Sequence, residues 1–323
     1  MNGLYNIRNT CCVNALVQCL RHSPSILKAL KNSKGNEDTP DILRRELMDV
    51  NRLLEKTSAR PDGLINAIFT IFKRSVVYGE QIDIDELWML FVDRLESELG
   101  HDTECTPSHN VHKKAKVGDQ FKMLDINSKV QNAKHMYNKG KTSLWLECVQ
   151  GTHLSVIHCT CGFSQANIEV FTSVNLEVPE KKQDDPSLSI VDLLNNYTSV
   201  EKVDHWKCDK CSKTCNASKK INIWDAPDVI IITLKRFKMM PNGNRVKTTV
   251  PVQVDEKFSM EKDYQLVAIG QHHGSYDGGH YTAICKSTKH WLLFDDLEVR
   301  DFGESLAYDP QNVYFLIYEA INE

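Results

Sequence analysis

The stretch Gly3-Leu-Tyr-Asn-Ile-Arg-Asn-Thr-Cys-Cys-Val-Asn-Ala-Leu-Val-Gln-Cys-Leu20 is a loop that runs into a helix. The loop contains residues that turn easily, namely Gly3, Asn6 and Asn9. Thr10 is a favoured residue at a helix N-terminus. Beyond it, apolar residues recur at the spacing of a helix with one buried face: Val13, Leu16, Val17 and Leu20. Cys11 and Cys12 therefore fall in the first turn, where unpaired N–H groups and the helix dipole favour a thiolate.

Composition limits the classes of protein to which the chain can belong. Its 323 residues are 41% hydrophobic and 25% charged, as expected of a globular protein with a large core. A net charge of -4 argues against general nucleic-acid binding, and the sequence shows no membrane-spanning run and no export signal. The 11 cysteines are mostly scattered, which favours a reducing compartment and thiols used for chemistry or metal.

Helical patterns come first in the chain and strand patterns later. Residues 11–99 are mostly helical, including Ile42–Leu54, Leu64–Phe72 and Ile84–Leu99. Predicted strands follow at Leu154–Cys161, Ala166–Val178, Lys219–Trp224, Asp228–Phe237, Tyr264–Gly270, Tyr281–Lys286, His290–Asp295 and Val313–Glu319, with a short helix at Ile190–Tyr197. This order, without βαβ alternation, predicts an α+β fold with an antiparallel sheet.

Residues 101–119 are polar and predict an insertion loop. A metal site of Cys105, His109 and His112 is the alternative for this segment.

The opening stretch closely resembles the cysteine box of the ubiquitin-specific proteases, Gly-Leu-x-Asn-Leu-Gly-Asn-Thr-Cys-aromatic-x-Asn. The matching residues are Leu4, Asn6, Asn9, Thr10, Cys11, Asn14 and Gln18. Arg8 stands where the family prefers Gly, and Cys12 stands where it prefers Phe or Tyr. The resemblance implies that Cys11 is the nucleophile, because it directly follows Thr10. Asn6 carries an amide able to reach an oxyanion formed at Cys11.

Two more segments resemble conserved family features near the catalytic cleft. Asp277-Gly-Gly-His280-Tyr281 resembles the histidine box and makes His280 the candidate general base for Cys11. Its two glycines permit a substrate backbone to approach closely. Gln81-Ile-Asp-Ile-Asp-Glu-Leu87 resembles the start of a helix that lines the cleft, and Asp83 with Glu86 also forms a variant of a capping box.

Trp291-Leu-Leu-Phe-Asp-Asp296 resembles the third catalytic box, and its geometry can be predicted separately. If Tyr281–Lys286 and Lys289–Asp295 form a hairpin, His280 lies directly opposite Asp295. That position suits a carboxylate that orients the imidazole ring. Asp296 then points to the other face and is a supporting residue.

Two short cysteine pairs predict a metal site. Cys208-Asp-Lys-Cys211 has the spacing of a zinc knuckle, and Cys159-Thr-Cys161-Gly162 is the candidate partner, one residue short. Alignment of the Cys-Gly pair with the family knuckle implies a structural zinc site of His158, Cys161, Cys208 and Cys211. Cys159 in place of His158, and a degenerate site without metal, are the alternatives.

The resemblance implies a papain-like hand over residues 1–323, a single catalytic domain. It consists of a helical thumb (about 1–143), β fingers tipped with zinc (about 144–227) and an antiparallel palm sheet (about 228–323). It also implies a thiol isopeptidase that cleaves after the C-terminal Gly-Gly of ubiquitin or a ubiquitin-like modifier. The expected partners are modifier conjugates, and neither nucleic acid binding nor membrane insertion is expected.

The short chain and the tandem Cys11-Cys12 resemble the interferon-induced member of the family, which removes the interferon-stimulated modifier. This implies a monomer of the cytoplasm or nucleus with a role in innate immunity. A general deubiquitinase is the alternative. Arg8 in the loop before Cys11 favours a third possibility, a non-catalytic binder of the modifier or of a signalling receptor.

Overall fold

The computed structural model describes residues 1–102, 123–180, 187–240, 242–275 and 278–321. Most of the predicted insertion 101–119 lies outside these residues, together with the alternative metal ligands Cys105, His109 and His112, and so does Asp277. At the start of that insertion, β1 (His101–Asp102) pairs with β2 (Lys141–Thr142).

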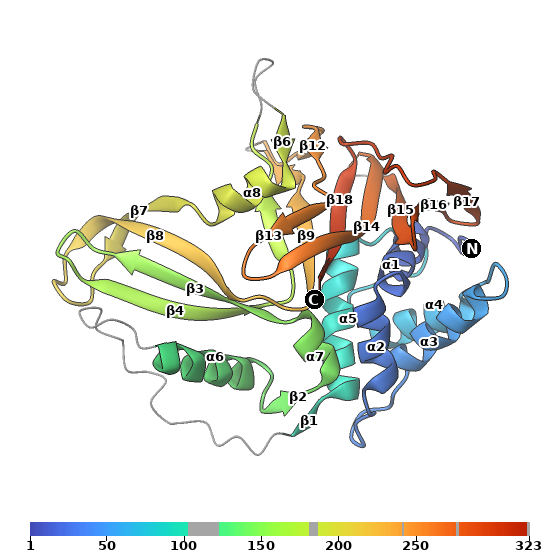
Figure 1. Cartoon of the computed structure of the whole chain (residues 1–323), viewed down its shortest axis with the longest axis horizontal. Helices are drawn as coiled ribbons and strands as arrows, with labels where there is room; N and C mark the ends of the chain where they lie inside the picture. Colours follow the sequence, from blue (N-terminus) through green and yellow to red (C-terminus); the bar gives the residue numbers. More distant parts are fainter. Residues whose placement is uncertain (103–122, 181–186, 241, 276–277, 322–323) are drawn as a thin grey trace.

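The helices of the N-terminal part lie together on one side of the molecule and form the thumb (Figure 1). They are α1 (Cys11–Arg21), α2 (Pro24–Asn32), α3 (Leu43–Leu54), α4 (Asp62–Ile71) and α5 (Ile84–Leu99), joined later by α7 (Leu144–Val149). The predicted cap of α5 is confirmed, because the Asp83 carboxylate accepts hydrogen bonds from the backbone N–H groups of Asp85 and Glu86 at 2.8 and 3.4 Å. Among the described residues, no helix is both long and apolar enough to cross a bilayer.

A central sheet, the palm, packs one face against the thumb helices. Its strand order is β17-β16-β15-β14-β18-β9-β5, and β13 pairs with the start of β14. The strands are β5 (Val174–Glu177), β9 (Val229–Lys235), β13 (Lys257–Ser259), β14 (Asp263–Gly274), β15 (Gly279–Ser287), β16 (His290–Asp295), β17 (Glu298–Asp301) and β18 (Val313–Ala320). Neighbouring strands are antiparallel, except that β5 and β9 are parallel.

Alternate side chains of β15 pack into two different hydrophobic cores. Tyr281, Ala283 and Cys285 face the thumb helices, whereas Ile284 faces a second core that is covered in part by α8 (Ile190–Tyr197). Burial on both faces fixes the strand firmly, because a slip of one residue would exchange the two cores.

A second sheet, the fingers, extends away from the palm (Figure 1). Its order is β4-β3-β8-β7, all antiparallel, with β3 (Gly151–His158), β4 (Ser164–Phe171), β7 (Val200–Lys207) and β8 (Thr214–Asp225). Helix α6 (Met123–Tyr137) packs on β4. Two small pairs complete the structure: β6 (Leu188–Ser189) with β12 (Val252–Gln253), and β10 (Phe237–Met239) with β11 (Arg245–Lys247).

The predicted fold class is confirmed, with two differences in detail. The stretch 166–178, predicted as one strand, breaks between β4 and β5, because β4 belongs to the fingers and β5 joins the palm. A palm strand therefore lies inside the range 144–227 that was predicted as fingers. Among the described strands, β5 and β9 are also the one parallel pair of the otherwise antiparallel palm sheet.

Candidate active site and metal centre

Cys11 lies at the start of α1, as predicted. Helix α1 packs against β15, and the Cys11 side chain is almost fully buried, with 2% of its surface exposed. Thr10 occupies the N-cap position, but its side chain does not cap the helix. Its hydroxyl instead accepts a hydrogen bond from the Ile7 N–H at 2.8 Å, which folds the loop before the helix.

His280, near the start of β15, is held by a carboxylate from the neighbouring strand. Its Nε2 lies 2.6 Å from Oδ1 of Asp295, at the end of β16. The predicted register was wrong by two residues: Ser287 pairs with His290, so Thr282 rather than His280 is expected opposite Asp295. A shift of two residues keeps both side chains on one face, so the diagonal neighbours still meet.

The two adjacent cysteines interact with different groups: Cys11 with His280, and Cys12 with the Asp83 carboxylate. A hydrogen bond with the Cys11 thiol raises the pKa of His280 to about 9, and Asp295 adds to this effect. Because Nε2 faces Asp295, the other ring nitrogen, Nδ1, is the one available to Cys11. By contrast, burial first and the nearby Asp83 carboxylate second raise the pKa of Cys12 well above its ordinary value. Cys12 therefore stays a protonated thiol.

Asp296 connects the loop before α1 to the end of β16. Its Oδ2 accepts a hydrogen bond from Asn6 Nδ2 at 2.8 Å, and its Oδ1 accepts one from Asn14 Nδ2 at 2.7 Å. Its carbonyl also accepts from the Leu4 N–H at 2.8 Å. Gly3 is required here, because a Cβ atom on it would lie 2.4 Å from the Asp296 carbonyl oxygen. Asn14 has no assigned role in the sequence prediction, which used it only as a matching residue.

Arg8, the departure from the family pattern, has a left-handed backbone with φ of 54°. That conformation explains a preference for Gly at this position. The Arg8 side chain is exposed and lies over the ring of Tyr78, 5.6 Å from its centroid. Its neighbour Asn9 donates from Nδ2 to the Gly79 carbonyl at 2.8 Å. The loop is thereby attached to the segment that precedes α5.

The glycine before His280 lies in a narrow space between thumb and palm. Its N–H donates to Oε1 of Gln81 at 3.0 Å, and its carbonyl accepts from the same side chain. A Cβ atom on Gly279 would lie 2.1 Å from Nε2 of His272, so no other residue fits there. The tyrosines Tyr281 and Tyr314 both donate to Oδ2 of Asp83, at 3.1 and 2.8 Å. The sequence prediction did not identify these tyrosine contacts, since they join residues far apart in the chain.

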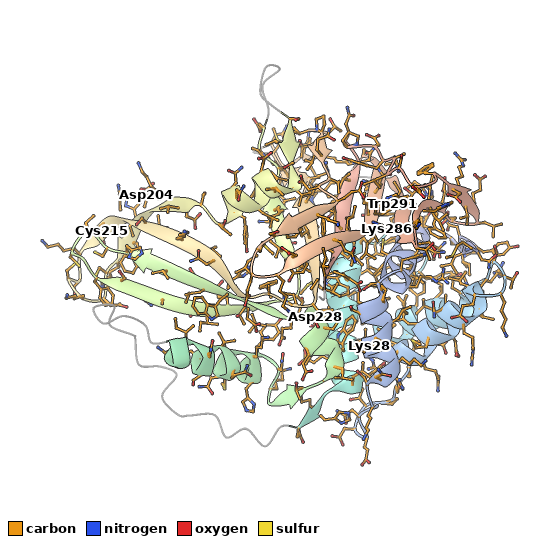
Figure 2. The ribbon with its side chains drawn as sticks, in the orientation of Figure 1. Lys28, Asp204, Cys215, Asp228, Lys286 and Trp291 are labelled. Atoms are coloured by element: carbon orange, nitrogen blue, oxygen red, sulfur yellow. The ribbon has the colours of Figure 1, made fainter. Side chains whose placement is uncertain are left out.

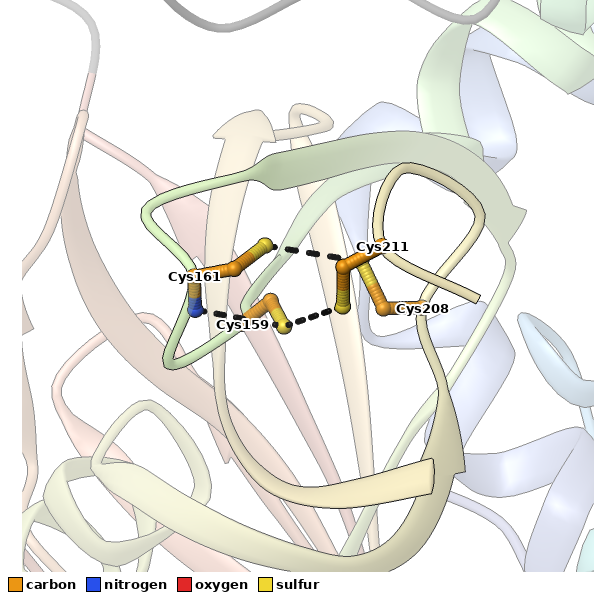
Figure 3. A group of neighbouring side chains, drawn as sticks. All are labelled: Cys159, Cys161, Cys208 and Cys211. Carbon is orange, nitrogen blue, oxygen red and sulfur yellow. Dashed lines mark hydrogen bonds between the residues drawn. The ribbon is translucent and has the colours of Figure 1, made fainter. Parts of the chain in front are cut away.

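Four cysteines gather at the tip of the fingers (Figure 3). The sulfur atoms of Cys159, Cys161, Cys208 and Cys211 all lie within 4.8 Å of one another. His158, the predicted ligand, is not in this group; its Nδ1 lies 2.6 Å from the Ser164 hydroxyl. The prediction of His158 as a ligand was therefore wrong, and Cys159, the stated alternative, is the fourth member of the cluster. The β3–β4 turn is tight enough that a Cys-x-Cys pair brings both sulfur atoms inward.

The cluster has the dimensions of a tetrathiolate zinc site. The sulfur atoms of Cys161 and Cys208 are 3.8 Å apart, and those of Cys159 and Cys211 are 4.0 Å apart. Zinc–sulfur bonds of about 2.3 Å in a tetrahedron place sulfur atoms roughly 3.8 Å apart. The group could therefore bind zinc, and four protein ligands would make it a structural ion.

Comparisons with known proteins agree with this geometry. The profile of the family described as "Ubiquitin carboxyl-terminal hydrolase" matches residues 2–318. Over 99% of the chain, 26% of residues are identical to ubiquitin carboxyl-terminal hydrolase 21 of Bos taurus, and the match covers 62% of that protein. The chain is 25% identical to the hydrolase Usp2 of Drosophila melanogaster, covering 98% of the chain and 34% of the relative.

Solved structures show the same fold. The SAGA DUB module of Ubp8, Sgf11, Sus1 and Sgf73 bound to monoubiquitin matches all of the chain and 69% of the other chain, with a TM-score of 0.73 and 21% identity. A structure of the yeast SAGA DUB module gives a TM-score of 0.74 at 22% identity, with the same coverage of both chains.

The helical thumb, the palm sheet and the fingers together form the papain-like hand that was predicted. Within that fold class, the chain belongs to the ubiquitin carboxyl-terminal hydrolase family, and it is of the ubiquitin-specific protease type. The predicted family is therefore confirmed. The chain spans about three fifths of the length of the Bos taurus relative.

Proposed function

We propose that this protein is a thiol isopeptidase that cleaves after the C-terminal Gly-Gly of ubiquitin or a ubiquitin-like modifier. The observation that carries the proposal is the contact of His280 with Cys11 on one side and with Asp295 on the other. A nucleophile, a base and an orienting group in hydrogen-bond reach are the requirements of nucleophilic acyl transfer.

In this mechanism the Cys11 thiol passes its proton to Nδ1 of His280 and attacks the carbonyl carbon of the terminal glycine. Asp295 keeps the ring oriented and stabilises the imidazolium. The imidazolium returns its proton to the leaving lysine amine, and the modifier remains as a thioester on Cys11. Water, deprotonated by His280, then releases the modifier as a free carboxylate and restores the thiol.

We assign the oxyanion to the start of α1. The first backbone N–H groups of a helix have no partner within the helix and point toward the nucleophile. Asn6 adds a donor, because its Nδ2 carries two hydrogens and Asp296 takes one. Asp296 acts here as a positioning residue, since it fixes both Asn6 and Asn14.

The bound ion in this proposal is a structural zinc on Cys159, Cys161, Cys208 and Cys211. It would cross-link the β3–β4 and β7–β8 turns and leave no position open for substrate. A catalytic zinc would make a different prediction. A chelator would then abolish turnover without any change in the structure of the fingers.

Different observations favour different modifiers as the substrate. The tandem Cys11-Cys12 favours the interferon-stimulated modifier, whereas the names of the relatives favour ubiquitin. With the first modifier, the proposal includes a role in innate immunity. In either case we propose a monomer that acts on conjugates in the cytoplasm or nucleus.

Two probes carrying an electrophile at the C-terminus, one made from ubiquitin and one from the interferon-stimulated modifier, test the proposal side by side. We expect a covalent adduct with at least one probe, and the faster probe identifies the modifier. Cys11→Ala should form no adduct, while Cys12→Ala should react like the wild type. Wild-type protein that reacts with neither probe would defeat the proposal for these two modifiers and favour a non-catalytic binder.

A further inference from the structure

A fifth thiol touches the cluster at the finger tip. Cys215, at the start of β8, has its sulfur atom 3.5 Å from that of Cys159. This is shorter than the 4.0 Å that separates Cys159 from Cys211. Figure 2 places Cys215 at the far end of the finger sheet, where it packs on the small core of Cys159, Phe163 and Cys208. No Cys-x-x-Cys motif includes Cys215, and the sequence alone therefore gave this nearby cysteine no role.

The cysteines of the cluster differ in their access to water. Cys159 and Cys208 are buried, with 6% and 0% of their surfaces exposed. Cys161 is exposed, and it stands next to Gly162 in the turn between β3 and β4. A ligand that solvent and other thiols can reach is the one most easily displaced. Cys161 is therefore the weakest of the four positions.

We propose that five thiols share this metal site, and that Cys215 occupies the fourth ligand position whenever Cys161 leaves it. The proposal rests on the zinc site described above and is independent of the catalytic reaction. Two thiolates on one zinc ion lie roughly 3.8 Å apart, and Cys215 already lies 3.5 Å from Cys159. Cys215 lies outside the group of four sulfur atoms that are all within 4.8 Å of one another, so the exchange requires its side chain to move inward.

The exchange is balanced in protons and electrons. Cys215 releases its thiol proton as its sulfur binds zinc, and the departing Cys161 thiolate takes up one proton. No oxidation occurs, and the ion keeps four thiolate ligands throughout. The consequence is a site that retains its metal although one ligand faces solvent.

The test is the zinc content of the full chain and its single and double variants, measured by elemental mass spectrometry after gel filtration. Wild type should carry one zinc per chain, and Cys161→Ser should retain it. Cys161→Ser combined with Cys215→Ser should lose it. Cys148→Ser, a buried cysteine in α7 outside the cluster, is the matched control and should leave the zinc content unchanged.

A kinetic measurement covers the case in which Cys161→Ser does not fold. Zinc release from Cys215→Ser to a chelating dye should be several-fold faster than from wild type, because no thiol fills the vacated position. Equal release rates, or zinc loss from Cys161→Ser as complete as from the double variant, would overturn the role of Cys215. Wild type without zinc would refute the metal site itself, while adduct formation with the electrophile probes would remain a separate result.

Discussion

The thumb–palm site and the finger tip hold their functional side chains by different means. Cys11 and His280 lie on α1 and β15, two elements that pack together within one large apolar core. The finger tip has only a small core of Cys159, Phe163 and Cys208, and most of β7 is exposed. Apolar burial therefore fixes the geometry of the candidate active site, whereas the finger tip, with so little apolar core, would depend on the proposed zinc and its thiol ligands. Disturbing one region should leave the other largely intact.

The largest expected effect is the loss of the nucleophile. Cys11→Ala should lower kcat/KM by roughly 10⁴-fold or more, because the residues of a nucleophile–base pair act as a unit. Its thermal midpoint should change little, since only one sulfur atom is removed from a large core. Hydrolysis of a fluorogenic modifier substrate measures the first quantity, and scanning fluorimetry measures the second. Cys12→Ala is the matched control and should keep most of the activity.

The next effect in size belongs to Asp295. Asp295→Asn should lower kcat/KM by about 10²–10⁴-fold, because the imidazole loses its orienting charge. The pKa of His280 is raised to about 9 with Asp295 as one of the causes. Loss of the carboxylate therefore lowers that pKa toward the ordinary value.

The sign of the pH effect follows from this shift. Activity that needs the imidazolium is present below the pKa of His280 and disappears as the pH rises through it. Wild-type kcat/KM should therefore decline near pH 9, and the decline in Asp295→Asn should occur at lower pH. Asp296→Asn is the matched control: it replaces one of the two carboxylate oxygens that accept from Asn6 and Asn14 but should leave the alkaline decline near pH 9. An unmoved decline in Asp295→Asn would contradict the role of its charge.

Local patterns in the sequence predicted two candidate catalytic residues that meet across one hairpin. The register of β15 and β16 was wrong by two residues, yet the contact between His280 and Asp295 was predicted correctly. An even shift preserves the face of each side chain, and the exact partner depends on a turn whose sequence is a weak signal. The helix Ile190–Tyr197 and the strand His290–Asp295 were predicted with the correct bounds, since periodicity and caps mark them locally.

Contacts between distant segments were not predictable in this way. The choice of Cys159 over His158 depends on which side chains the β3–β4 turn directs inward, and spacing alone does not fix this. Similarly, the two hydrogen bonds that Asp296 accepts from Asn6 and Asn14 join residues more than 280 positions apart in the chain. Only the packing of α1 against the palm sheet creates them.

Removal of the metal should affect the fingers more than the catalytic site. A chelator should lower the thermal midpoint and speed hydrogen exchange in the turns that carry Cys159 and Cys208, while exchange in α1 and β15 stays unchanged. We expect kcat/KM to fall by less than about 10-fold and to recover with added zinc, because no step of the reaction uses the ion. His158→Ala, with its ring on Ser164, should leave the metal content unchanged. Abolished turnover with unaltered finger exchange would instead indicate a catalytic metal.

The smallest expected effect concerns Arg8, which attaches the loop before Cys11 to Tyr78. A double-mutant cycle of Arg8→Gly and Tyr78→Leu, followed by urea unfolding, should give a coupling energy of about 0.5–1 kcal/mol, the range of exposed cation–π contacts. Arg8→Gly alone should be close to neutral, because Gly relieves the cost of a positive φ while losing the ring contact. Its kcat should remain within a few-fold of wild type, since the Arg8 side chain lies over Tyr78 and the Asn6 amide is already fixed by Asp296. A gain of more than 10-fold in kcat would show that Arg8 restrains the oxyanion loop, and it would restore the argument for a protein selected to bind rather than to cleave.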